Sequence, residues 1–551
     1  MAHEGILYVT MAPKPSLSSA RFHDWYNNEH GPLRLRHPSI FRNGFRYRAT
    51  DLDDTGKGEH EWMAIYDVTD MKELVKEPYT LLRQPPAESQ RERDTKAQIN
   101  ISRKFFDLVK DWKSEKWTPL ETVKEGQNRV IVQVSFYLKP GGDPAELAKW
   151  YTEEHVPMLS KVPGWLRSRR FVSSSIEPKD DIEYMALHEY EPENGLGGPE
   201  HKAASATDMT KKIYEMIKAR HRRVFGLYYT FGQAPRDLTS LSSPDVPAET
   251  STDGKTKSFP ASTGVAFPAI ESYITTPDGV EISYRLEGSW DQDAPLILLS
   301  NAILTEWGIW DNFVSTFLSK HSNYRILRYN TRGRYAKHGT KPINVDVLAG
   351  DIISLLDAVR VPKAALMIGV SLGGCTVLNA SISNPQRVAR FISCDTASSA
   401  VPGNDKAWKE RIAIAEKQGA TNEAGETIVG SELAELTVRR WFNPESYKKS
   451  EFLPVAEKVK GMVERWSLDG FKACVQALWV YDLKDKAAKS DLPCTYLAGE
   501  KDGAMPATME KMSKEYGKSG AQYVVLAGAG HLPMVENEQG FLDEVEKFLK
   551  A

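Results

Sequence analysis

The chain has few cysteines and no long apolar run. Its four cysteines, Cys375, Cys394, Cys474 and Cys494, all lie in the C-terminal half, and their spacing fits neither a zinc site nor a disulfide framework. We expect reduced, buried thiols, which favours the cytoplasm, and no metal site. No stretch of about 18 apolar residues occurs, and the first residues lack the basic and apolar regions of a signal peptide. We therefore expect neither secretion nor insertion into a membrane.

An excess of charge of one sign is also lacking. Lys and Arg number 71 and Asp and Glu number 74, so the net charge is only −3. This balance gives no reason to expect nucleic acid or an anionic membrane as a partner. With 41% hydrophobic and 26% charged residues, the composition is that of a globular protein, and 551 residues suggest roughly three or four domains. The expected partner is a small-molecule substrate.

One segment lacks any sustained hydrophobic period. Residues 235–268 are dense in Ser, Thr, Pro, Gly and Asp, which is typical of a linker. Before the linker we expect two repeated domains, at 1–122 and 123–234. After it we expect one larger domain, at 269–551.

A W-Y-x-x-E-H-x-P motif carries the repeat. It begins at Trp25 and again at Trp150, 125 residues later. In both copies an alternating strand precedes the motif, and two strands, a charged helical stretch and an aromatic-rich segment follow it in the same order. This order predicts a ferredoxin-like β-α-β-β-α-β unit, an antiparallel sheet with both helices on one face. The open face of each sheet then needs a partner.

The motif resembles that of the EthD-like members of the dimeric α/β-barrel group, and the likeness covers both repeats. In that group two such sheets pack face to face, which implies one barrel within the chain or pairing between chains. The resemblance also implies a homo-oligomer held through the barrels. His30 and His155 occupy the same place in both copies and are candidate acid/base groups of a second site. The alternative is structural, with each histidine hydrogen-bonded to a glutamate or to the backbone.

The C-terminal domain has the pattern of a largely parallel sheet covered by helices. The sequence Gly369-Val370-Ser371-Leu372-Gly373 follows an apolar strand and precedes a helix-compatible run. A G-x-S-x-G sequence between strand and helix is typical of a nucleophile elbow. After a hairpin at 277–279, short apolar strands are predicted at 296–299, 326–329, 365–368, 391–394, 495–498 and 523–526.

A serine hydroxyl is a poor nucleophile until a base removes its proton, so the elbow requires a histidine and an acid that orients it. Asp502 follows a predicted strand, and His531 lies in a Gly-rich loop after the last strand. The chain order Ser371, Asp502, His531 is that of α/β hydrolases. Asp395, which also follows a predicted strand, is the alternative acid.

Acyl transfer also requires N–H donors for an oxyanion, usually from the residue after the nucleophile and from the loop after the third strand. These donors would be the amides of Leu372 and Ala302. An insertion at about 397–490, rich in helix formers and aromatics, predicts a helical cap over the serine. Buried aromatics are more often core, and arginines are more often paired, than in contact with substrate. The candidate pocket residues are Trp441, Trp466, Trp479 and Arg440, with Arg332 and Arg439 as further candidates for binding a substrate carboxylate.

Several segments of this domain resemble the 3-oxoadipate enol-lactonases. They are LLSNA at 298–302, RYNTRGR at 328–334, the elbow, WFNP at 441–444 and AGEKDG at 498–503. The resemblance implies that Ser371 attacks a lactone carbonyl, that His531 protonates the departing enolate, and that no metal or organic cofactor is needed. Asn330, Arg334 and Tyr335 depart from the family pattern, which leaves the identity of the lactone open.

We therefore expect an α/β hydrolase with a helical cap that opens a lactone or carboxylic ester, preceded by repeats that serve assembly. One alternative is a bifunctional enzyme whose N-terminal barrel isomerises or otherwise converts the lactone, by analogy with the related fold of muconolactone isomerases. The other is a binding or scaffold protein without activity. Such a protein would have no need for a nucleophile elbow with both partners in order.

Overall fold

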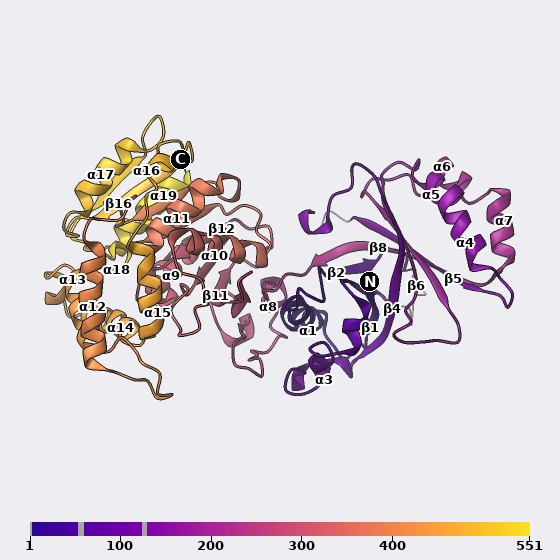
Figure 1. The fold of residues 1–551 in the computed structure, drawn as a ribbon, viewed down its shortest axis with the longest axis horizontal. Helices are drawn as coiled ribbons and strands as arrows, with labels where there is room; N and C mark the ends of the chain where they lie inside the picture. Colours follow the sequence, from indigo (N-terminus) through magenta and orange to yellow (C-terminus); the bar gives the residue numbers. More distant parts are fainter. Residues whose placement is uncertain (1–2, 53–59, 124–128, 551) are drawn as a thin grey trace. The chain divides into compact units, whose positions relative to one another are not determined.

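The computed structural model describes residues 3–52, 60–123 and 129–550, and the chain divides into two compact units (Figure 1). Unit 1 is Met1–Gln233 and unit 2 is Ala234–Ala551. Across the described residues, no helix combines the length and the apolarity that crossing a bilayer requires.

Unit 1 contains a closed antiparallel barrel in the order β1-β3-β2-β8-β5-β7-β6-β4. Each repeat supplies four strands, and the pairs β2–β8 and β4–β6 join the two copies. Because the barrel closes within the chain, it leaves no open edge that requires a second chain. The ferredoxin-like and EthD-like assignments of the copies stay predictions. The strands are β1 (Gly5–Pro13), β2 (Phe45–Ala49), β3 (Trp62–Val68), β4 (Ile99–Lys113), β5 (Val130–Leu138), β6 (Trp165–Ser173), β7 (Glu183–Tyr190) and β8 (Ile217–Thr230).

Alternation along the strands gives unit 1 separate apolar clusters. On β1, Ile6 and Tyr8 belong to a buried cluster to which all eight strands contribute. Leu7 and Val9, which point the other way, belong to a cluster that also contains Trp25 of the repeated motif. Side chains on a strand alternate between its two faces, so both faces of β1 are apolar and both are covered.

The repeated motif forms a helix with a π-helical turn in the middle. In the first copy the turn is η1 (Tyr26–His30), and in the second it is η5 (Tyr151–His155). The sequence predicted a helix here, but a single wider turn leaves no mark in a 3.6-residue period. The helices of unit 1 are α1 (Ser19–Trp25), α2 (Gly31–Leu35), α3 (Gln90–Lys96), α4 (Pro144–Trp150), α5 (Val156–Leu159), α6 (Pro199–Ala203) and α7 (Asp208–Glu215).

Unit 2 is built on a nine-stranded sheet in the order β17-β16-β15-β14-β12-β13-β11-β10-β9. Strands β12 to β17 run parallel, whereas β9, β10 and β11 are antiparallel to their neighbours. All six apolar strands predicted after the hairpin are present. The strands are β9 (Lys257–Phe259), β10 (Ala269–Thr275), β11 (Glu281–Gly288), β12 (Leu296–Ser300), β13 (Arg325–Tyr329), β14 (Leu366–Val370), β15 (Phe391–Cys394), β16 (Cys494–Gly499) and β17 (Gln522–Leu526).

Two groups of helices accompany this sheet. The first group is α9 (Asp311–Lys320), α10 (Val345–Ala358), α11 (Leu372–Ser383), α17 (Met505–Glu515), α18 (Pro533–Glu536) and α19 (Glu538–Lys550). The second group falls between β15 and β16, within the residues expected to form a cap, and is called the insertion below. The insertion contains α12 (Asn404–Gln418), α13 (Ser431–Trp441), α14 (Leu453–Glu464), α15 (Leu468–Cys474) and α16 (Lys484–Ala487).

Parts of the predicted linker at 235–268 form short secondary structure within unit 2, which the sequence did not predict. A short helix, α8 (Leu238–Leu241), buries both of its leucines. Farther on, β9 pairs with β10 at the edge of the sheet. A four-residue helix and a three-residue strand are too short to produce a hydrophobic period, so the polar composition concealed them.

Candidate active site

Ser371 lies at the turn between β14 and α11 with φ 56° and ψ −118°. Positive φ is rare for a residue with a side chain and stores strain at functional turns. The Ser371 amide donates to the Cys394 carbonyl at 2.8 Å, which ties the turn to β15. A Cβ added at Gly369 would lie 2.0 Å from the Gly373 carbonyl oxygen, and one at Gly373 would lie 2.3 Å from that of Ser300. Only glycine fits at either position, which is the physical basis of the motif.

The backbone amides of Leu372 and Ala302 follow the ends of the neighbouring strands β14 and β12. Leu372 is the first residue of α11, where N–H groups have no partner within the helix. Ala302 is fully buried in the loop after β12, and its carbonyl accepts from the Thr305 hydroxyl at 2.8 Å. Within the described ranges, neither the Leu372 nor the Ala302 amide has a hydrogen-bond acceptor. Both N–H groups are therefore available to an oxyanion.

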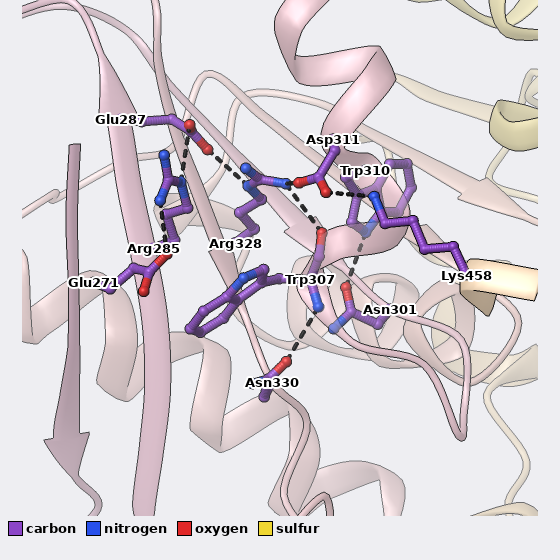
Figure 2. A network of polar contacts seen from close by, with 10 residues as sticks. All are labelled: Glu271, Arg285, Glu287, Asn301, Trp307, Trp310, Asp311, Arg328, Asn330 and Lys458. Atoms are coloured by element: carbon purple, nitrogen blue, oxygen red, sulfur yellow. Dashed lines mark hydrogen bonds and ion pairs between the residues drawn. The ribbon is translucent and has the colours of Figure 1, made fainter. Parts of the chain in front are cut away.

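Polar contacts hold the loop that carries Ala302 (Figure 2). Asn301 Oδ1 accepts from the indole N–H of Trp310 at 2.9 Å. Asn330 Oδ1 accepts from the Trp307 amide at 3.1 Å, and Asn330 Nδ2 donates to the Ser283 hydroxyl at 3.1 Å. Asn330, a departure from the enol-lactonase pattern, therefore acts here as a loop anchor.

Figure 2 shows that the same network crosses the sheet to the insertion. Arg328 of β13 donates to the Trp307 carbonyl at 3.2 Å and pairs with Glu287 at 2.7 Å and with Asp311 at 2.5 Å. Asp311 also pairs at 2.6 Å with Lys458 of α14. The loop of Ala302 is thus connected through charged groups to both the sheet and the insertion.

His531 and Asp502 form a hydrogen-bonded pair, with Nδ1 of His531 2.7 Å from Oδ2 of Asp502. A carboxylate can only accept a hydrogen bond, so Nδ1 carries a proton, and in the neutral ring Nε2 keeps a lone pair for use as a base. Burial acts to raise the pKa of Asp502, but the neighbouring His531 and its hydrogen bond lower it below its ordinary value. Asp502 is therefore the ionised partner of this histidine.

Asp395, the alternative acid, is close enough to Asp502 to feel its charge. Its Oδ1 accepts from the Gly499 amide at 2.9 Å. Burial raises the pKa of Asp395 well above its usual range, and the charge of Asp502 raises it further. Asp395 is therefore a neutral acid beside the Asp502 carboxylate, and the carboxyl group that contacts His531 is that of Asp502.

Sequence analysis missed one group that holds the loop of His531. Glu536 accepts from the Gly530 amide at 2.6 Å, the Asn443 amide at 2.9 Å and the Ser446 hydroxyl at 2.6 Å. Burial raises the pKa of Glu536. Its position five residues after the histidine carried no motif that distinguishes it from a surface glutamate.

Of the predicted pocket residues, Trp441 comes closest to the histidine. Its ring stacks on that of His531 with centroids 5.7 Å apart, and its carbonyl accepts from the His531 amide at 2.7 Å. Trp466 and Trp479 each have a buried indole N–H without a partner among the described residues. Arg440 is exposed at the end of α13, and its positive charge helps to lower the pKa of Asp502.

Two other arginines considered for substrate binding are engaged elsewhere. Arg332 is buried and pairs with Asp351 at 2.6 Å and with Asp278 at 2.7 Å. Arg439 pairs with Glu435 of its own helix at 2.8 Å. The structural role that the sequence left open for these arginines is the one observed.

The candidate histidines of unit 1 lie in separate apolar clusters and are not brought together. His30 Nδ1 lies 3.1 Å from Glu92 Oε1, whereas His155 Nδ1 lies 3.0 Å from the Ala204 carbonyl oxygen. Each histidine therefore makes the kind of contact that the structural alternative predicted.

Residues 295–538 match the family model described as the alpha/beta hydrolase fold. This part of the chain has the α/β-hydrolase fold. The fold predicted for the C-terminal domain is thereby confirmed, and the elbow, the histidine loop and the insertion of the hydrolase all fall within the matched residues.

Known proteins similar to this half of the chain include lactonases and esterases. A 3-oxoadipate enol-lactonase of Acinetobacter baylyi is 27% identical over 276 residues, which are 50% of this chain and 95% of the relative. A pimeloyl-[acyl-carrier protein] methyl ester esterase of Pectobacterium atrosepticum is 25% identical, over 49% of this chain and 98% of the relative. The crystal structure of the enol-lactonase from Burkholderia xenovorans is 27% identical, with a TM-score of 0.44 and coverage of 51% of this chain and all of that one.

Proposed function

We propose that unit 2 opens a lactone or a carboxylic ester through an acyl-enzyme on Ser371. The observation that carries the proposal is the 2.7 Å hydrogen bond between His531 and Asp502. This pair lies at the end of the parallel sheet that also carries the strained turn of Ser371. A serine, a histidine with a free Nε2 and an ionised orienting acid are the groups that acyl transfer requires.

The proposed steps follow from these groups. His531 Nε2 takes the proton of the Ser371 hydroxyl as Oγ attacks the substrate carbonyl, and the amides of Leu372 and Ala302 stabilise the oxyanion. Collapse of the tetrahedral intermediate breaks the ester bond, and His531 protonates the departing enolate or alcohol. A water molecule, deprotonated by His531, then attacks the acyl-enzyme and releases the acid.

An enol-lactone is the substrate class that we propose. The support is the likeness of this half of the chain to enol-lactonases. The unpartnered indole N–H groups of Trp466 and Trp479 in and next to the helices of the insertion suit a substrate with polar groups on an apolar body. Ketonisation of the enol product would make opening effectively irreversible.

For unit 1 we retain assembly as the proposed role, in a chain that acts in the cytoplasm. Because the barrel closes within one chain, assembly would use its outer surface. Sedimentation of the full chain tests this proposal, and a monomer at micromolar concentration would contradict it.

The hydrolase proposal is tested with the purified full chain and Ser371→Ala on a panel of enol-lactones, aromatic lactones and short p-nitrophenyl esters. We expect the wild type to turn over at least one class and Ser371→Ala to lose at least about 10³-fold in kcat, because no other group replaces the nucleophile. Ser354→Ala is the matched control and should keep full activity, because the Ser354 hydroxyl only donates to the Gly350 carbonyl of its own helix, α10. Equal activity of wild type and Ser371→Ala would refute the mechanism.

A further inference from the structure

A cavity of about 230 Å³ lies in the first copy of unit 1. A water molecule occupies roughly 30 Å³ of liquid, so this cavity has room for a small organic molecule. Cationic side chains dominate the charged part of its lining: Arg34, Arg83, Lys96 and Arg103 face it, against the single carboxylate of Glu92. Much of the remaining wall is apolar or aromatic and includes Met11 and Trp25.

Arg34 is a buried cation in this wall, with only 6% of its surface exposed. Its Nη1 donates to the His30 carbonyl at 2.6 Å, and its Nε is buried without a partner. Across residues 3–52, 60–123 and 129–550, no carboxylate lies within 4 Å of the Arg34 guanidinium. The charge of Glu92 helps to raise the pKa of Arg34, but Glu92 does not pair directly with the guanidinium. An anion bound in the cavity would supply a direct partner for this buried cation.

His30 lines the same cavity and is oriented by Glu92. Its Nδ1–H donates to Glu92 at 3.1 Å, which leaves the lone pair on Nε2. Burial, and then the charge of Arg34, lower the pKa of His30 to about 4, so that the ring is neutral at pH 7. The wall thus holds a cation that can bind an anion and an imidazole that can accept a proton.

The second copy of the motif serves as an internal comparison. Both copies keep a contact between the motif glutamate and the residue that caps the last helix of the copy, α3 or α7: Ser89 donates to Glu29, and Thr207 donates to Glu154, each at 2.5 Å. These contacts are shared, so they belong to the fold.

The groups at the cavity are not shared. Leu159 stands at the motif position of Arg34, and Thr210 stands where Glu92 does, three residues after the cap. His155 consequently donates to a backbone carbonyl instead of a carboxylate. The buried cation and the oriented imidazole are therefore additions specific to the first copy and are not requirements of the helix.

We propose that this cavity is a second ligand site, which binds a small organic carboxylate with a single apolar ring. The carboxylate pairs with Arg34, the ring packs against Trp25 and the aliphatic wall, and His30 faces the ligand as a proton acceptor. The proposal goes beyond hydrolysis by unit 2 and does not depend on it.

The test uses the full chain with Ser371→Ala as the parent, titrated by calorimetry at pH 7 with benzoate and with uncharged benzamide. We expect saturable binding of benzoate, with benzamide at least about tenfold weaker because it cannot pair with Arg34. Arg34→Leu copies the second repeat and should remove one benzoate site per chain. Arg170→Leu, which removes another buried arginine that lies over Tyr151, is the matched control and should keep that site.

A second measurement locates the ligand without altering Arg34. Benzoate should shift the methyl NMR signal of Met11, assigned by its loss in Met11→Leu, and leave the signal of Met534 in unit 2 in place. Benzoate binding to Arg34→Leu with the stoichiometry of the parent would overturn the proposal. So would saturation without a shift of Met11, equal affinity for benzamide, or no saturable binding to the parent. If Arg34→Leu fails to fold, the Met11 shift and the preference for benzoate decide the question.

Discussion

Two carboxyl groups at neighbouring strand ends show how single residues acquire different roles. Asp502 is ionised because His531 donates to it, whereas Asp395 is buried beside an existing negative charge and is held neutral. Like charges in contact cannot both ionise at low cost, so the partner of each group decides its state. Asp395 then acts on His531 only through Asp502.

The two positions are predicted to respond differently to the same substitution. Asp502→Asn leaves His531 without its orienting carboxylate and should lower kcat by about 10⁴-fold, as loss of a triad acid does. Asp395→Asn keeps a neutral group that can donate to Asp502 and accept from the Gly499 amide, so its loss should be about tenfold or less. Steady-state hydrolysis of the best lactone by both variants checks this prediction. A larger loss of kcat for Asp395→Asn than for Asp502→Asn would mean that Asp395 is the acid that orients His531.

At the scale of elements, the elbow depends on the close approach of α11 to the loop after β12. In Gly373→Ala the new Cβ would lie 2.3 Å from the Ser300 carbonyl oxygen. We expect a loss of roughly 1–3 kcal/mol in the free energy of unfolding, together with a loss of activity, because backbone must move. Gly350→Ala is the matched control, since nothing lies within 4 Å of its Cβ on α10. A helical Gly→Ala change should stabilise unit 2 by roughly 0.5–1 kcal/mol.

Urea unfolding of the two glycine variants beside the wild type measures both effects. If Gly373→Ala unfolds at the wild-type urea concentration, α11 and the loop do not approach each other as described.

The charged network across the sheet yields another prediction. Arg328 is 5% exposed and joins β11, β13 and α9, so Arg328→Met should cost roughly 1.5–3 kcal/mol of stability, because buried Glu287 loses one of its two cationic partners and keeps only Arg285. Lys458→Met removes a partner of Asp311 that is 48% exposed, and should cost about 1 kcal/mol or less. Thermal unfolding of both variants checks the difference, and equal costs would mean that the network does not hold the sheet.

At the scale of the whole molecule, buried histidines should make unit 1 sensitive to acid. Burial lowers the pKa of both His30 and His155 from 6.5 to about 4. Between these pH values the unfolded chain binds more protons than the folded one. The contribution of each buried, neutral histidine to the stability of unit 1 is therefore complete above about pH 6.5. It falls as the pH drops towards 4 and falls no further below that.

At pH 5 each of these histidines should have removed about 2 kcal/mol from the stability of unit 1. Hydrogen exchange of peptides from β1 and β5 at pH 7 and pH 5, corrected for intrinsic rates, measures the loss. In His155→Gln the loss in β5 should be smaller, because the substituted side chain does not titrate. Protection of β5 that is independent of pH in the wild type would contradict the prediction.

Local patterns by themselves determined much of this protein. Gly369 is required by a backbone contact with Gly373 within the same turn, so a short motif records it. Apolar strands and the recurring W-Y-x-x-E-H-x-P motif likewise carry their structural signal in adjacent residues, which is why the sheet of unit 2 and the repeat were predictable.

Tertiary structure alone decided which distant groups meet. It closed the barrel within one chain, gave His531 the carboxylate of Asp502 instead of Asp395, and packed the polar segment after Gln233 onto the hydrolase sheet. It also placed Glu92 against His30 from 62 positions away. Each outcome depends on how separate elements pack, and the free energy of that packing belongs to contacts between segments. No periodicity within a single segment records such contacts.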